Sequence, residues 1–243
     1  MRGKGLLPPA IGQREAVFDA FARAHYQPFI DAIKGVSSHA FDDSRGPSFV
    51  ERDLIECDQL VGKGDDAADF IVVLEAFNNS SGAGTLTDSK GNTWSQLTKQ
   101  GTGGSGATVL WYAKNAIVGS GHTFTITGNS TYSAIAVAAF SGSDLTAPFD
   151  VQSGHNLGNS LTDQPGSVTP GAANALVITG LEFNSAPVSV DSGVTILDQA
   201  PMTGGQYFGV ALGYTIQTTA VPINPTWRQA APGQLASIVA TFK

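Results

Sequence analysis

The chain has 243 residues, of which 42% are hydrophobic and only 14% are charged, whereas an ordinary soluble domain carries about 25% charged residues. Its net charge of −7 argues against nucleic acid as a partner, because phosphate binding depends on clustered Lys and Arg. No apolar run approaches the roughly 18 residues of a membrane-spanning helix, so a membrane is not an expected partner either.

Residues 1–47 are predicted to form an N-terminal arm that consists of a helix, at about residues 13–34, and a polar linker. Val17, Phe21 and Ala24 recur at helical spacing and give this helix one apolar face. A helix this short is not stable alone, so it either covers an open end of the following domain or anchors the chain to a larger assembly. The first residues lack the apolar core of a secretory signal, and we expect none.

Residues 48–243 are predicted to form an all-β domain, because the hydrophobic period changes to two and turn residues recur at intervals near ten residues. The expected fold is an antiparallel two-sheet β-sandwich, jelly-roll-like in its arrangement. Strands are predicted over residues 49–61, 68–77, 92–98, 106–114, 121–128, 131–141, 162–169, 174–184, 193–198, 206–217 and 234–242.

Two of these segments, 133–140 and 175–181, are apolar at nearly every position. This pattern indicates strands covered on both faces, and we expect residues 133–140 to form a central strand. Between them, His155 is expected in a long polar loop.

The segment from Asp88 to Trp94 predicts a hairpin turn. Gly91 supplies a residue that tolerates positive φ, and the Asp88 side chain can accept hydrogen bonds from the turn backbone. Trp94 and Trp111 are expected to pack in the core. Tyr112 would then point outward, because neighbouring side chains in a strand alternate.

Several phrases, taken in order, resemble a known kind of module. These are Thr87–Trp94, Leu110–Asn115, Gly121–Thr127, Ala136–Gly142, Pro148–Asp150 and Ala173–Ile178. Over residues 50–243 the chain resembles a β-sandwich module of bacterial surface proteins and of structural proteins of tailed phages. The resemblance implies the sandwich architecture, and such families carry no agreed catalytic residues.

No residue combination predicts a catalytic, cofactor or metal site. The four histidines, His25, His39, His122 and His155, lie at no metal-ligand spacing. The single cysteine, Cys57, excludes an internal disulfide and is expected to be a small buried residue.

Carboxylates were considered for two further kinds of site. Glu75 and Glu182 lie in apolar strands and could form a glycosidase pair, but we expect both to point to solvent. Asp65, Asp66 and Asp69 could hold calcium, although a solvated acidic turn is the preferred interpretation.

The leading hypothesis is therefore a non-enzymatic virion structural protein of a tailed phage, a capsid decoration or head/tail surface protein attached through its arm. Its expected partners are other virion proteins, such as the major capsid protein, and further copies of itself. The alternative is a secreted carbohydrate-binding module that stacks sugar on Tyr112, Tyr132, Tyr207 or Trp227, with Trp227 expected to be the most exposed. A hydrolase that uses Glu75 or Glu182 is the third hypothesis.

Overall fold

A computed structural model describes residues 50–54, 68–78, 82–101, 106–119, 121–128, 133–201 and 208–243. The predicted arm and helix, together with Cys57, Asp65 and Asp66, lie outside these residues. The described part is all-β, and every strand pairing in it is antiparallel. None of its residues is helical, so it holds no helix that could cross a membrane.

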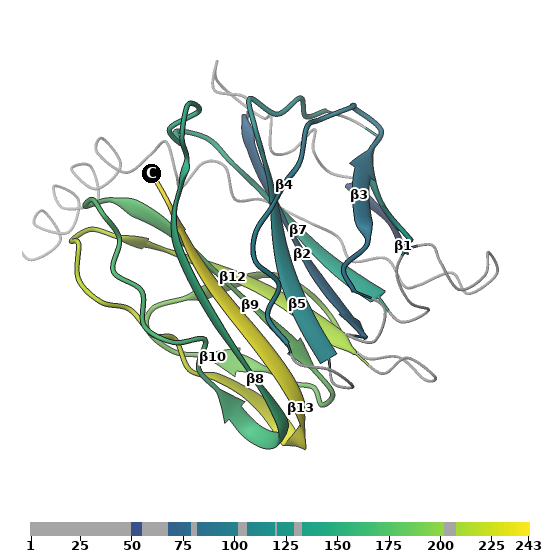
Figure 1. The fold of residues 1–243 in the computed structure, drawn as a ribbon, viewed down its shortest axis with the longest axis vertical. Helices are drawn as coiled ribbons and strands as arrows, with labels where there is room; N and C mark the ends of the chain where they lie inside the picture. Colours follow the sequence, from purple (N-terminus) through teal and green to yellow (C-terminus); the bar gives the residue numbers. More distant parts are fainter. Residues whose placement is uncertain are drawn as a thin grey trace, which may run out of the picture.

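The strands are β1 (Val50–Leu54), β2 (Phe70–Asn78), β3 (Thr85–Asp88), β4 (Ser95–Gln96), β5 (Gly106–Lys114), β6 (His122–Thr127), β7 (Ser133–Phe140), β8 (Phe149–Asp163), β9 (Ala175–Phe183), β10 (Ser189–Val190), β11 (Thr195–Ala200), β12 (Gly209–Gln217) and β13 (Trp227–Phe242). In place of two sheets, the described residues form three (Figure 1). A small sheet has the order β1-β6-β3 and a central sheet the order β4-β5-β2-β7. A large sheet has the order β10-β13-β9-β12-β11, and β8 also pairs with β13.

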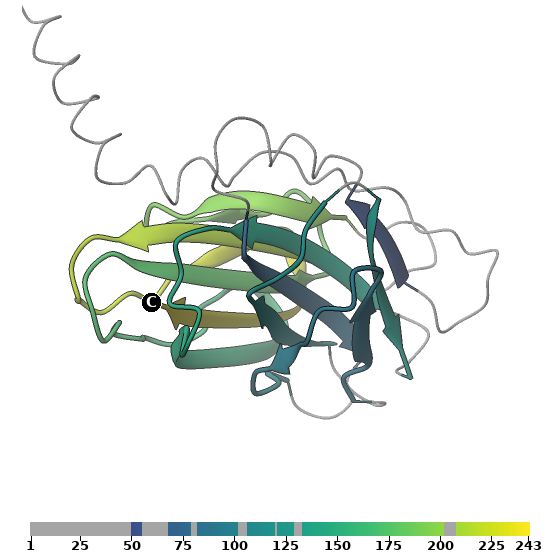
Figure 2. The same ribbon diagram turned by 90° about the horizontal axis from the view of Figure 1, so that it is seen from above.

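The central sheet is packed on both faces. Along β2, Phe70, Val72 and Leu74 face the large sheet, where they meet β9, β12 and β13. The intervening Ile71 and Val73 face the small sheet, because successive side chains in a strand point to opposite faces. The two hydrophobic cores therefore lie on either side of one sheet, and Figure 2 shows the layers from a second direction.

Strand β7 agrees with its predicted burial but not with its predicted position. All its residues except the partly buried Ala134 are buried, yet it is the last strand of the central sheet. Its free edge is covered by β11, where the Asp198 carboxylate accepts a hydrogen bond from the Val137 amide at 3.0 Å. A register shift between Ile196 and Asp198 accompanies this contact. The prediction for 175–181 is confirmed, because β9 is buried throughout and lies inside the large sheet.

At the other edge of the central sheet, next to β4, a glutamine joins the central sheet to the large sheet. The Gln152 side chain of β8 accepts a hydrogen bond from the Thr98 N–H and donates one to the Thr98 carbonyl, both at 3.0 Å. This amide imitates the pairing of a neighbouring strand. Beside it, a side chain at Gly154 would have its Cβ 2.0 Å from Gln100 Cγ, so only glycine leaves room for this approach.

Glycine also permits a close contact between the central and large sheets. Gly180 of β9 faces Leu74 of β2, and a Cβ at position 180 would lie 2.4 Å from Leu74 Cδ2. Gly180→Ala is therefore expected to lower the free energy of unfolding by about 1–3 kcal/mol through overpacking. Chemical denaturation measures this change.

Gly158→Ala is the matched control, because no atom lies within 4 Å of its Cβ position. Its effect is expected to stay within about 0.5 kcal/mol. Equal destabilisation by the two substitutions would contradict the close contact between Gly180 and Leu74.

Candidate functional site

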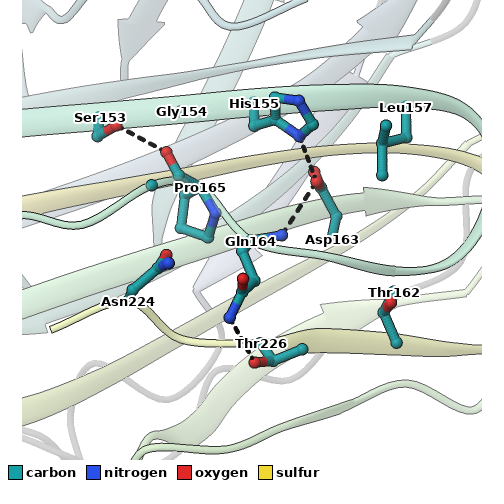
Figure 3. A pocket seen from close by; sticks show the side chains of 11 residues that line it. Ser153, Gly154, His155, Leu157, Thr162, Asp163, Gln164, Pro165, Asn224 and Thr226 are labelled. Carbon is teal, nitrogen blue, oxygen red and sulfur yellow. Dashed lines mark hydrogen bonds and ion pairs between the residues drawn. The ribbon is translucent and has the colours of Figure 1, made fainter.

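An open pocket of about 680 Å³ lies on the large sheet (Figure 3). It is lined by Ser153, His155 and Leu157 of β8, by the segment 162–166, and by Asn224 and Thr226. These positions are distant in sequence. The pairing of β8 with β13 and the isolated bridge between Val168 and Ile223 bring them together.

A histidine and a buried aspartate form the polar centre of this pocket. His155 Nδ1 lies 2.6 Å from Asp163 Oδ1, with the His155 side chain 52% exposed and the Asp163 side chain fully buried. The Gln164 amide donates to Oδ1 at 3.0 Å, and the Ser237 hydroxyl donates to Oδ2 at 2.8 Å. Three donors thus hold the carboxylate, which in turn orients the imidazole.

Strand register explains how these residues meet. His155 and Ser237 are directly paired between β8 and β13, and paired residues of antiparallel strands point to the same face. In a straight strand, residues 155 and 163 would be separated by about 26 Å. The pairing of β8 with β13 shifts register between Arg228 and Gly233 and again between Gly233 and Leu235, opposite residues 157–162 of β8. The two strands are therefore irregular between His155 and Asp163, and Asp163 returns to His155.

The prediction that His155 lies in a loop is wrong, because residues 149–163 form β8. The pattern is misleading because β8, among the described strands, pairs its backbone with β13 only. Nearly all of its residues are partly buried or exposed, so it needs no apolar alternation. The strand predicted over 162–169 correspondingly ends at Asp163, although Val168 keeps one bridge to Ile223.

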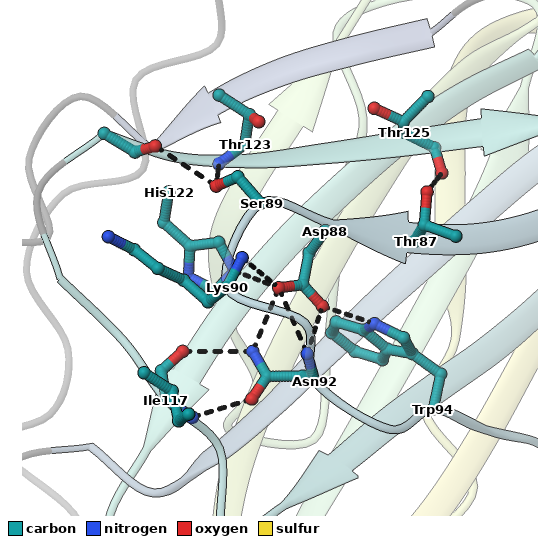
Figure 4. A network of polar contacts seen from close by, with 11 residues as sticks. Thr87, Asp88, Ser89, Lys90, Asn92, Trp94, Ile117, His122, Thr123 and Thr125 are labelled. Carbon is teal, nitrogen blue, oxygen red and sulfur yellow. Dashed lines mark hydrogen bonds and ion pairs between the residues drawn. The ribbon is translucent and has the colours of Figure 1, made fainter.

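A second polar cluster centres on Asp88 and secures the predicted turn (Figure 4). Its carboxylate accepts hydrogen bonds from the Lys90 amide (2.8 Å), the Asn92 amide (3.1 Å), Asn92 Nδ2 (3.2 Å) and Trp94 Nε1 (2.7 Å), and it lies 3.1 Å from His122 Nε2. Gly91 has a φ of 75°. The predicted roles of Asp88 and Gly91 in a turn are confirmed. The turn is not the expected hairpin, because β3 belongs to the small sheet and β4 to the central sheet.

The electrostatics of this cluster favour an ionised aspartate and a neutral histidine. Burial opposes ionisation of Asp88, but hydrogen bonds from Trp94, Lys90 and Asn92 outweigh it and lower the pKa of the carboxyl. Burial also lowers the pKa of His122, against the opposing effect of Asp88. The His122 side chain is fully buried and stacks on Phe124, with 4.3 Å between ring centroids. The contacts of these groups with one another give the cluster a structural role in holding the turn.

Glu75 and Glu182 do not point to solvent, contrary to the sequence expectation. Both are fully buried, because each faces the space between two sheets. Glu75 accepts hydrogen bonds from the Gly84 amide and from Trp111 Nε1, each at 3.3 Å.

Glu182 lies against Gly106, and a Cβ at that glycine would be 2.4 Å from its Cδ. Neither of its oxygens has a hydrogen-bond partner of good geometry. Burial, with a smaller effect of the Asp163 charge, raises the pKa of Glu182 to about 8, and the Ala236 amide offsets part of this rise.

Of the four aromatic residues proposed for sugar stacking, the structure describes Trp227 and Tyr112. Trp227 is fully buried and donates from Nε1 to Thr179 Oγ1 at 2.9 Å, so its predicted exposure is wrong. Trp111 is buried and Trp94 packs against the same core, as predicted. Tyr112 is partly buried against the other core, whereas Tyr132 and Tyr207 lie outside the described residues.

The described residues contain no group of three or more His, Cys, Asp or Glu side chains placed to hold a metal ion. Of the three aspartates considered for calcium, the structure describes Asp69 alone. Comparison with protein-family models, curated proteins and solved structures gave no match to this chain.

Asp88→Asn is expected to destabilise the fold by about 2–3 kcal/mol, because one carboxylate oxygen becomes a donor facing other donors. The free energy of unfolding in urea measures this loss. Asp144 is the matched control. It is exposed and accepts the amides of Thr146 and Ala147, a role that asparagine also fills. Asp144→Asn should therefore change stability little, and an equally small effect at Asp88 would contradict its central role.

Glu182 is expected to make stability fall with rising pH. The folded state keeps its proton up to about pH 8, whereas the unfolded carboxyl loses it near the ordinary value of 4.5. The unfolded state thus binds fewer protons between these values, so the free energy of unfolding decreases as pH rises.

Glu182→Gln should remove this pH dependence of the free energy of unfolding. At pH 9 the free energy of unfolding of the variant should exceed that of wild type by several kcal/mol, to order of magnitude. Urea denaturation of both proteins from pH 5 to 9 measures the difference, in which the titration of all other groups cancels. Parallel profiles would show that Glu182 titrates normally.

Proposed function

We propose that this chain is a non-enzymatic structural protein of a tailed-phage virion, a capsid decoration or head/tail surface protein. In this proposal the helix at residues 13–34 attaches the chain to other virion proteins such as the major capsid protein. Residues 48–243 form the exposed β-sandwich, and its arrangement is jelly-roll-like. The chain is expected to self-associate and to be located in the virion.

The observation that carries this proposal is burial. The candidate catalytic glutamates and the described candidate sugar-stacking aromatics are packed between the sheets of a charge-poor sandwich. Glu75 and Glu182 are enclosed between sheets, which weakens the hydrolase hypothesis, since a glycosidase needs two carboxyl groups across an accessible cleft. Trp227 and Tyr112 belong to the cores, which weakens the version of the carbohydrate-binding module that stacks sugar on them.

The low charge supports association with protein partners. Only 14% of the residues are charged, and uncharged hydroxyl and amide groups cost less to desolvate at an interface than Lys or Glu. The resemblance to tailed-phage structural modules points in the same direction. Closed symmetric oligomers are the default for a subunit of this kind.

The full-length chain is expected to cosediment with empty capsids assembled from the major capsid protein encoded beside its own gene. Phe21→Asp places a carboxylate on the apolar face of the predicted helix and should abolish cosedimentation, because that face can no longer be buried. Arg23→Asp introduces the same group on the opposite side of that helix and should leave most of the binding.

Two results would contradict the proposal. One is a genomic neighbourhood without capsid or portal genes. The other is a full-length chain that remains in the supernatant at capsid concentrations that saturate known decoration sites.

A further inference from the structure

Strand β8 lies at one margin of the large sheet. Over residues 235–242, β13 pairs with β9 on one side and with β8 on the other (Figure 1). Among the described residues, no backbone hydrogen bond joins β8 to any segment other than β13. The N–H and C=O groups of β8 that point away from β13 therefore form an edge to which a further strand can pair.

Both faces of β8 are covered by its own chain. Neighbouring side chains of a strand point to opposite faces, and Gln152 and Ser153 show what lies on each. On the inner face, the Gln152 side chain bonds to the Thr98 backbone. On the outer face, the Ser153 hydroxyl donates to the Pro165 carbonyl at 2.7 Å. The strand thus presents its edge to a partner, and not a face.

Residues 152–157 are the regular part of this edge. They pair with β13 without interruption, whereas the register shifts on either side, before Gln152 and after Leu157. Such irregularities disturb an edge and hinder the pairing of another strand. The regular part spans about 20 Å, which is enough for about six hydrogen bonds in an antiparallel pair.

This regular part lacks the usual protection of a strand edge. Its sequence is Gln-Ser-Gly-His-Asn-Leu, without Lys, Arg, Asp, Glu or Pro. The margins of the central sheet, by contrast, are each met by a side chain of the large sheet, Gln152 or Asp198. Proteins blunt exposed edges with charge, proline or covering groups, so an edge without them indicates a surface that pairs with another strand.

The charge distribution favours a second copy of the chain as the partner. The whole chain has a net charge of −7, so two copies repel one another over most of their surfaces. Residues 152–157 bring no charged side chain opposite a like charge, which would destabilise a strand pair. The acidic residues nearby are held within the chain, Asp150 by the Gly171 amide and Asp163 by the Ser237 hydroxyl.

We propose that residues 152–157 of β8 pair antiparallel with the same residues of a second copy, about a twofold axis, and join the two large sheets into one. In such a pair each edge supplies the donors and acceptors that the other needs. The inference rests on the self-association expected in the proposed function, and it identifies the surface. One strand pair is a small interface, so the isolated dimer is expected to be weak and to form at about 0.1–1 mM chain.

Hydrogen exchange of the full-length chain at about 10 µM and about 1 mM, together with sedimentation velocity, tests the proposal. At the higher concentration the chain should sediment as a dimer. The amides of residues 152–157 that point away from β13 should then exchange at least about fivefold more slowly. A monomer at about 1 mM, or a dimer in which these amides keep their low-concentration rates, would overturn the proposal.

Asn156→Pro and Leu157→Pro separate the edge from the fold. Of two neighbouring residues in a strand, one N–H points toward β13 and the other away. One variant therefore loses a bond to β13 and should melt at a lower temperature, whereas the other loses only a donor of the edge and should remain folded. The folded variant is expected to dimerise at least about tenfold more weakly. Wild-type dimerisation of that variant would overturn the proposal, and the exchange experiment decides if neither variant folds.

Ile117→Asp is the matched control, because Ile117 lies outside β8 and, at 61% exposure, is the most exposed large hydrophobic residue that the structure describes. It should dimerise as wild type does, and loss of its dimer would place the contact elsewhere and overturn the proposal. Phe21→Asp distinguishes this inference from the proposed function, since it should lose capsid cosedimentation and keep the dimer. A chain that pairs through β8 without binding capsids would support the inference and contradict the virion role.

Discussion

The fold depends on the burial of both faces of the central sheet. Because β2 sends alternate side chains into two hydrophobic cores, none of its positions with a described side chain can be given to solvent. Burial of each large apolar side chain contributes roughly 1.5–3 kcal/mol, and β2 alone supplies several. A polar group that faces either core must therefore find a partner or change its protonation state, as Glu75 of β2 and Glu182 of β9 illustrate in opposite ways.

The same constraint explains how the sheet edges are managed. The central sheet ends at β4 and β7, and unpaired edges next to a hydrophobic layer invite association with other chains. Single side chains, Gln152 on one side and Asp198 on the other, bond to backbone groups at these two ends. The central and large sheets are thus joined at both margins without a continuous ladder between them.

Sequence patterns predicted the locally determined parts of this structure. Strands β2 and β5 were found almost to the residue, and the Asp88 turn was predicted because its chemistry is confined to seven consecutive positions. The orientation of Glu182 and the burial of Trp227 were not predicted. Alternation along a strand was taken to mean one buried face and one solvated face, whereas a third sheet and outer segments cover the second face. The pocket escaped prediction for another reason. It depends on register shifts between β8 and β13 near the contact of two residues eight apart, and nothing in the local composition encodes them.

The contact between Gly106 and Glu182 has a consequence for the evolution of the chain. The Glu182 side chain fills the space that a side chain at position 106 would need. The two positions are therefore expected to covary, although they lie 76 residues apart. A lineage that acquired a larger residue at position 106 would survive best with a shorter one at 182. Such paired changes would record the stacking of the central and large sheets in homologous sequences.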